Sequence, residues 1–66
     1  MNIIARKPKD TEGNEYVVVE RSSASMRFVS ATANARSIAG NEWFWGHYFA
    51  TRDEALAHSH AREVQR

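Results

Sequence analysis

Three histidines are the side chains of this 66-residue chain that could bind a metal ion. His58 and His60 stand two residues apart in a segment expected to be helical, where a two-residue step separates side chains by about 200°. They therefore do not chelate one ion. His47 comes from an expected strand and would have to lie beneath the helix to meet His60, and two ligands are fewer than a zinc site uses. The pattern predicts no metal site, with His60 partly buried and hydrogen-bonded and His58 solvated.

Other reactive residues lack the setting that catalysis needs. No serine stands in a Gly-x-Ser-x-Gly segment, cysteine is absent, and the three glycines are isolated instead of forming a phosphate-binding loop. Asp53 and Glu54 are explained by helix capping. A chain of this length also has little room for a pocket of roughly 300–1,000 Å³. We therefore expect a non-enzymatic protein with no catalytic residue and no cofactor.

Arginines offer a different chemistry, the binding of nucleic acid. Arg6, Arg21, Arg27 and Arg36 lie in the half of the chain where most strands are expected. Arginines interleaved with aromatic residues on a sheet can stack on bases or enter a groove. The chain is nearly neutral, however, with nine Lys and Arg against eight Asp and Glu, whereas nucleic-acid binders usually carry a basic excess. A DNA- or RNA-binding module that uses these four arginines is therefore the alternative function.

The elements that position these side chains are predicted from hydrophobic patterning. Apolar and β-branched runs predict strands at about residues 2–7, 15–21, 26–32 and 42–50. Residues 31–39 leave two alternatives open. Their alanines, followed by Gly40 and Asn41, are typical of a helix and its end, whereas a tight turn at Gly40-Asn41 would join two strands. We favour strand or irregular structure there.

The segment "TRDEAL" predicts the start of a C-terminal helix at about residues 52–64. Thr51 and Glu54 form a capping box, in which each side chain accepts a hydrogen bond from the backbone of the other residue. The narrow apolar face expected to dock consists of Leu56, Ala57, His60 and Val64, with Ala61 at its edge. The face expected to point away from it consists of Ala55, His58, Ser59 and Arg62.

The aromatic segment "EWFWGHYF" is the feature on which the functional prediction depends. Because side chains alternate along a strand, one face is expected to carry Trp43, Trp45, His47 and Phe49. The other face is expected to carry Phe44, Gly46 and Tyr48. Both faces of the sheet are then partly apolar, and one helix covers only one of them. Residues 31–39, an identical subunit or another macromolecule could cover the second face.

These observations predict one small α+β domain: a three- to four-stranded antiparallel sheet with one C-terminal α-helix packed on one face. We expect a non-enzymatic regulatory or accessory protein that acts by protein–protein contact, as a homodimer or with another protein. Chains of this size are common among phage and mobile-element modulators of a host machine. The expected interface residues are Trp43, Phe44, Trp45 and Tyr48.

The expected location follows from the N-terminus and from composition. "MNIIARKPKD" has only a short apolar stretch, which predicts neither a signal peptide nor a membrane anchor. The absence of cysteine fits a reducing compartment. We therefore expect a soluble, cytoplasmic protein. Over residues 15–62 the order of strands followed by "FATRDEAL" loosely resembles the arm-binding modules of phage integrases, without the basic excess of those modules.

Overall fold

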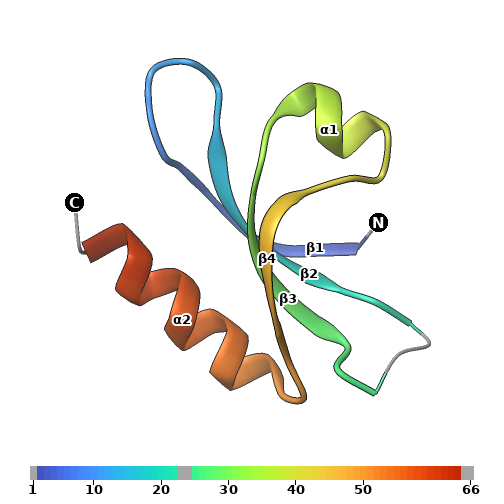
Figure 1. Cartoon of the computed structure of the whole chain (residues 1–66). Helices are drawn as coiled ribbons and strands as arrows, with labels where there is room; N and C mark the ends of the chain where they lie inside the picture. Colours follow the sequence, from blue (N-terminus) through green and yellow to red (C-terminus); the bar gives the residue numbers. More distant parts are fainter. Residues whose placement is uncertain (1, 23–24, 65–66) are drawn as a thin grey trace.

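The computed structural model of the chain describes residues 2–22 and 25–64, which form one sheet and two helices (Figure 1). The strands are β1 (Asn2–Pro8), β2 (Glu15–Glu20), β3 (Phe28–Ala33) and β4 (Phe44–Phe49). The helices are α1 (Ala35–Ala39) and α2 (Arg52–Val64). The strands pair in the order β1-β2-β3-β4, each antiparallel to its neighbour. This confirms the predicted α+β fold in its four-stranded form.

β2 lies at the centre of the core because its β-branched residues are enclosed by two neighbouring strands. Val17, Val18 and Val19 are at most 1% exposed, and β-branched side chains pack well on a pleated surface. Since side chains alternate along a strand, Val17 and Val19 face one side of the sheet while Val18 faces the other. Both sides of the sheet therefore need a cover.

One side, which we call the α1 face, is covered by α1 and by the segment that follows it. Its buried cluster consists of Val17, Val19, Val29, Ala31 and Ala33. Ile3, Ile38 and Trp43 are half-buried and pack against this cluster. Residues of the chain itself therefore cover this face. This agrees with the alternative in which residues 31–39 fold over the second face of the sheet.

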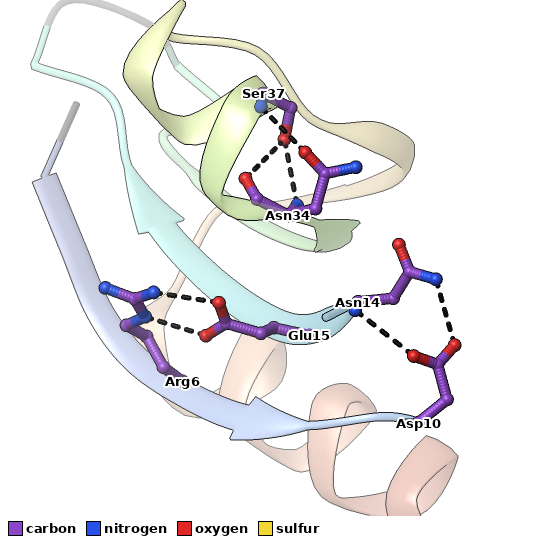
Figure 2. Close-up of polar contacts among 6 residues, drawn as sticks. All are labelled: Arg6, Asp10, Asn14, Glu15, Asn34 and Ser37. Carbon is purple, nitrogen blue, oxygen red and sulfur yellow. Dashed lines mark hydrogen bonds and ion pairs between the residues drawn. The ribbon is translucent and has the colours of Figure 1, made fainter. Parts of the chain in front are cut away.

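α1 corrects the preference for strand or irregular structure over residues 31–39. β3 continues to Ala33, and a single helical turn follows at Ala35–Ala39. Asn34 caps it: its side-chain oxygen accepts from the N–H of Ser37 at 2.8 Å, and the Ser37 hydroxyl accepts from the N–H of Asn34 at 3.0 Å (Figure 2). These two bonds satisfy backbone donors that so short a helix leaves unpaired.

α2 covers the opposite side, which we call the α2 face, in contact with β2, β3 and β4. Figure 1 shows the two helices on opposite sides of the sheet. The face of α2 that docks is the one expected to point away. Ala55 and Ser59, one turn apart, are buried, whereas Ala57 and His60 are exposed. The predicted docking face is therefore wrong.

Polar bonds to β3 explain which face of α2 docks. His58 Nδ1 lies 2.9 Å from the Ser30 hydroxyl, and Arg62 Nη2 donates to the Thr32 hydroxyl at 2.9 Å. Both hydroxyl residues are buried, and a buried polar group without a partner costs about 1–3 kcal/mol. Hydrogen bonding to these hydroxyls outweighs the small apolar gain that the opposite, alanine-rich stripe offers.

Thr51 caps α2 with one of the two predicted capping-box hydrogen bonds and with a second bond whose donor differs from the prediction. Glu54 N–H donates to the Thr51 hydroxyl at 3.3 Å, as expected. The Glu54 carboxylate accepts from the hydroxyl of Thr51 at 2.8 Å, where the prediction had the backbone N–H of Thr51 as donor. Asp53 and Glu54 place negative charge in the first turn of the helix, where the helix dipole favours it.

The loop between β1 and β2 is closed by Asp10. Its carboxylate accepts hydrogen bonds from the N–H and the side-chain amide of Asn14 (Figure 2). It also accepts one from the N–H of Glu12. The Asn14 amide is the main cause that holds the pKa of Asp10 below its usual value. Gly13, with a φ of 89°, supplies the left-handed residue that this turn requires.

Candidate protein-interaction surface

The largest apolar side chains of β4 stay in contact with solvent. Trp45 is 73% exposed, Tyr48 43% and Phe44 42%, and we call these three residues the β4 aromatic surface. β4 is an edge strand, since only β3 pairs with it within the described sheet. Large apolar side chains that share one exposed edge are typical of a contact site between macromolecules.

A bulge in β4 sets the direction of these side chains. Ser30 pairs with His47 and Thr32 with Phe44, so β4 has one residue more than β3 between the two pairs. Trp45, with a φ of 51°, adopts the left-handed conformation within that extra length. A non-glycine residue seldom adopts this conformation, and bulges are known for redirecting side chains at sheet edges. The bulge therefore directs Trp45, the most exposed aromatic residue among those described, into solvent at the edge of the sheet.

The same bulge moves Trp43 to the opposite face from the one predicted. Regular alternation would place Trp43 on the side of His47, but its indole packs against the core of the α1 face. Its Nε1 donates to the Tyr48 hydroxyl at 3.3 Å. A Cβ added to Gly46 would lie 2.8 Å from that Nε1, so the ring rests directly on the glycine. Trp43 is thus half-buried and supports the surface from beneath.

Tyr48 is also held by Arg21, the residue that follows β2. The guanidinium carbon of Arg21 lies 4.7 Å from the centre of the Tyr48 ring, and Nη2 donates to the Met26 carbonyl. Stacking of a guanidinium on an aromatic face is a favourable cation–π contact. The Tyr48 ring is therefore fixed on one side by Arg21 and at its hydroxyl by Trp43, while the rest remains open to solvent.

Phe44 and Trp45 form the other part of the surface. Their ring centres are 6.2 Å apart with the planes inclined at 54°, a spacing at which aromatic pairs attract. Lys9 Nζ lies 5.7 Å from the Trp45 ring centre and 5.9 Å from that of Tyr16. Trp45 is thus positioned by the β4 bulge, by the Phe44 ring and by contact with Lys9 of the β1–β2 loop.

The four arginines expected to bind nucleic acid differ in whether their guanidinium groups already contact other residues or are exposed to solvent. Arg6 makes two 2.8 Å hydrogen bonds with Glu15, and this bonding raises the pKa of Arg6 and lowers that of Glu15 (Figure 2). Arg21 faces Arg27 across the strands, its N–H donating to the Arg27 carbonyl at 2.7 Å. The Arg21 side chain turns onto Tyr48, while Arg27 and Arg36 are exposed.

The histidine contacts differ from the prediction. His47 meets His58, not His60, with ring centres 4.5 Å apart, and His60 is exposed. His58 is half-buried against Ser30 and Phe49. Burial is the main cause that lowers the pKa of His58, followed by repulsion from His47 and Arg62. Within the part of the chain that the structure describes, no three His, Cys, Asp or Glu residues come together as metal ligands would.

The α1 face contains an open hollow of about 550 Å³ beside the end of β2. Its lining includes Val19, Trp43 and Arg21 together with the carboxylate of Glu20. The chain was expected to have little room for a pocket of this volume, and it nevertheless forms an open hollow of that size.

Comparison of the chain with protein-family models, with curated proteins and with solved structures found no match. None of the helices among the described residues is long and apolar enough to cross a membrane.

Proposed function

We propose that this chain is a small regulatory or accessory protein, not an enzyme, that acts by binding protein through the β4 aromatic surface. The observation that carries the proposal is the distribution of large apolar side chains. The largest fully buried side chains are four valines, a threonine and a serine, whereas Phe44, Trp45 and Tyr48 remain exposed. Tyr16 is buried in the core, but Phe44, Trp45 and Tyr48 are left at an edge, which favours a contact role over a packing role.

Exposed aromatic side chains that neighbouring residues hold in a fixed position are typical of binding hot spots. Tryptophan, tyrosine and arginine dominate the residues whose loss costs most at protein interfaces. Here Tyr48 is held in place by Arg21 and Trp43, so little side-chain freedom would be lost when a partner covers it. This pre-organisation supports Tyr48 as one anchor of the contact, with Trp45 as the larger one.

Charge supports a protein partner over nucleic acid. β4 itself carries no Asp, Glu, Lys or Arg between residues 44 and 49. The cationic groups beside the β4 aromatic surface, on Arg21 and Lys9, already lie over the Tyr48 and Trp45 rings, whereas phosphate binding usually draws on a larger basic excess. Of the four candidate arginines, Arg6 is already paired with Glu15. The proposal therefore assigns the contact to apolar burial, which changes little with salt concentration, unlike counterion release.

Photo-crosslinking in the native host tests the proposal. We would place a photoreactive phenylalanine analogue at Trp45, irradiate cells, and identify covalent adducts by mass spectrometry. The matched control carries the analogue at Ala57, which is exposed on α2 far from the edge strand. Protein adducts at position 45 that are absent at position 57 are the expected result. Equal adducts at both positions, or nucleic acid as the main adduct at position 45, would contradict the proposal.

A further inference from the structure

We infer that the protein bound at β4 is a second copy of this chain, whose β4 pairs antiparallel with the first to join two four-stranded sheets. The inference rests on the proposed function, because it names the partner of the β4 aromatic surface. It further specifies a two-fold arrangement centred on Tyr48.

The backbone of β4 is oriented for such pairing. Arg21 N–H donates to the Arg27 carbonyl, so residues 21 and 27 continue the register of the β2–β3 ladder as a hydrogen-bonded pair just beyond Glu20 and Phe28. Because backbone groups alternate in direction along a strand, the groups of Phe28 and Ser30 point towards β4. Their partners Phe49 and His47 point back to β3. Tyr48, between those two, therefore directs its N–H and C=O away from the sheet.

The two edges of the sheet differ in how far they resist pairing. β1 is bulged between Ile3 and Ala5 and carries Arg6, Lys7 and Pro8, which are the features that protect a natural edge strand. β4 carries no such charge or proline, and residues 47–49 pair regularly with β3. β4 is itself bulged at Trp45, so the unprotected and regular part of this edge is residues 47–49, which includes the exposed Tyr48.

Identical copies suit this edge for reasons of symmetry and charge. In an antiparallel pair centred on Tyr48, the outward N–H of each copy meets the outward C=O of the other, and the two Tyr48 rings become cross-strand neighbours. The chain has a formal net charge of +1, so two copies repel each other little. β4 itself contributes no Asp, Glu, Lys or Arg that would require a partner of opposite charge.

The area available predicts a weak dimer. An aromatic side chain has a total surface of about 150–250 Å². Multiplied by the exposed fractions of Phe44, Trp45 and Tyr48, this gives an exposed aromatic area of roughly 350 Å² per copy. Two copies would bury at most roughly 700 Å² from these rings, even with all three covered, which is below the 1,200–2,000 Å² or so of a stable interface. The backbone and neighbouring groups add to this area. We therefore expect association that depends on concentration in the micromolar to millimolar range.

Sedimentation equilibrium of two variants at position 48 tests strand pairing directly. Tyr48→Pro removes the outward N–H without removing a bond to β3, whereas Tyr48→Val loses the same ring contacts but keeps the N–H. We expect Tyr48→Val, which loses the anchoring ring, to dimerise more weakly than the wild-type chain, and Tyr48→Pro to be monomeric with an unchanged circular dichroism spectrum. Equal association constants for the two variants would overturn pairing through the edge.

A disulfide trap gives a second, independent measurement. The chain contains no cysteine, so Tyr48→Cys introduces a single thiol. Hydrogen-bonded cross-strand partners have Cα atoms about 5.5 Å apart, within the range that a disulfide spans. We expect mild oxidation to link Tyr48→Cys rapidly, and the control Lys7→Cys on the exposed side of β1 to stay unlinked. Equal linking of both variants would show random collision and overturn the arrangement.

The same experiments separate this inference from the proposed function. A wild-type chain that stays monomeric at millimolar concentration, while Trp45 still crosslinks to a different protein in cells, overturns self-pairing and leaves the proposed function standing. A monomer whose position 45 crosslinks no more than position 57 overturns both.

Discussion

His58 on α2 and Ser30 on β3 are joined by a 2.9 Å contact between the imidazole Nδ1 and the hydroxyl oxygen. Ser30 is fully buried, so the helix supplies a partner for a hydroxyl that would otherwise be isolated in the sheet. The imidazole also lies against His47, with ring centres 4.5 Å apart. The attachment of α2 therefore depends on a titratable group whose neutral form the fold favours.

Acidification from pH 8 to about pH 5.5 is expected to lower the melting temperature. Burial, His47 and Arg62 lower the pKa of folded His58 from the 6.5 of the free side chain. Above that value His58 is neutral in both states. As pH falls, the unfolded chain takes up the proton first, so stability is lost progressively until pH passes below the folded pKa. Thermal unfolding followed by circular dichroism at several pH values measures this.

Two glutamine variants provide the control for that pH dependence. His58→Gln keeps a side chain able to reach Ser30 but removes the titration, and its melting temperature should fall less over the same pH range. His60→Gln, on the exposed side of α2, should follow the wild type. An identical pH profile for His58→Gln and the wild type would show that His58 is not the responsible group. The carboxylates of Asp10 and Glu15, with lowered pKa values, titrate at lower pH.

Gly46→Ala is expected to destabilise the fold by about 1–3 kcal/mol, the usual cost of overpacking. The new Cβ would lie 2.8 Å from Trp43 Nε1 and 3.1 Å from Val29 Cγ1, so the indole has to move. Gly40→Ala is the matched control, since its Cβ meets only ordinary contacts at 3.7 Å or more. Urea unfolding followed by tryptophan emission measures both. A loss for Gly46→Ala no larger than that for Gly40→Ala would be evidence against the close packing of Trp43.

Asn34→Ala is expected to cost about 1 kcal/mol, the typical value for a lost N-cap. The variant removes the oxygen that accepts from Ser37 N–H. Asn34→Asp retains an acceptor at that position and should stay close to the wild type. Because α1 supports Ile38 on the α1 face, Asn34→Ala should also expose that face more to solvent. Equal urea midpoints for the alanine and aspartate variants would show that the cap contributes nothing.

The fold class was predictable because β-branched runs and the Thr51 cap are local features. The strand runs around Val17 and Val29 and the start of α2 depend on few distant contacts. α1 was not assigned because Asn34 and Ser37 form a capping box with serine where glutamate or glutamine is usual. The side of α2 that docks was also missed, because the hydroxyls of β3 that attract it lie about thirty residues away in sequence.

The sequence predicted which aromatic residues are exposed on β4 better than it predicted the face of the sheet to which each side chain points. Phe44, Trp45 and Tyr48 were expected to be interface residues, and all three are exposed. Trp43 was expected with them and is half-buried, because the bulge at Trp45 interrupts the two-residue alternation on which the prediction relied. A bulge depends on tertiary context and on one left-handed residue. Tryptophan is an unusual choice for that conformation, so its identity gave no indication of the bulge.

Arg62→Ala is expected to destabilise the fold by about 1–2 kcal/mol, because it removes the donor to the buried Thr32 hydroxyl and the contact with the Tyr16 ring. The loss is limited, since Arg62 Nη1 is itself buried without a hydrogen bond among the described residues. Arg62→Met keeps the apolar stem and separates packing from hydrogen bonding. Arg52→Ala, at the exposed start of α2, should change stability little. Urea midpoints for Arg62→Ala equal to those for Arg52→Ala would exclude a docking role for Arg62.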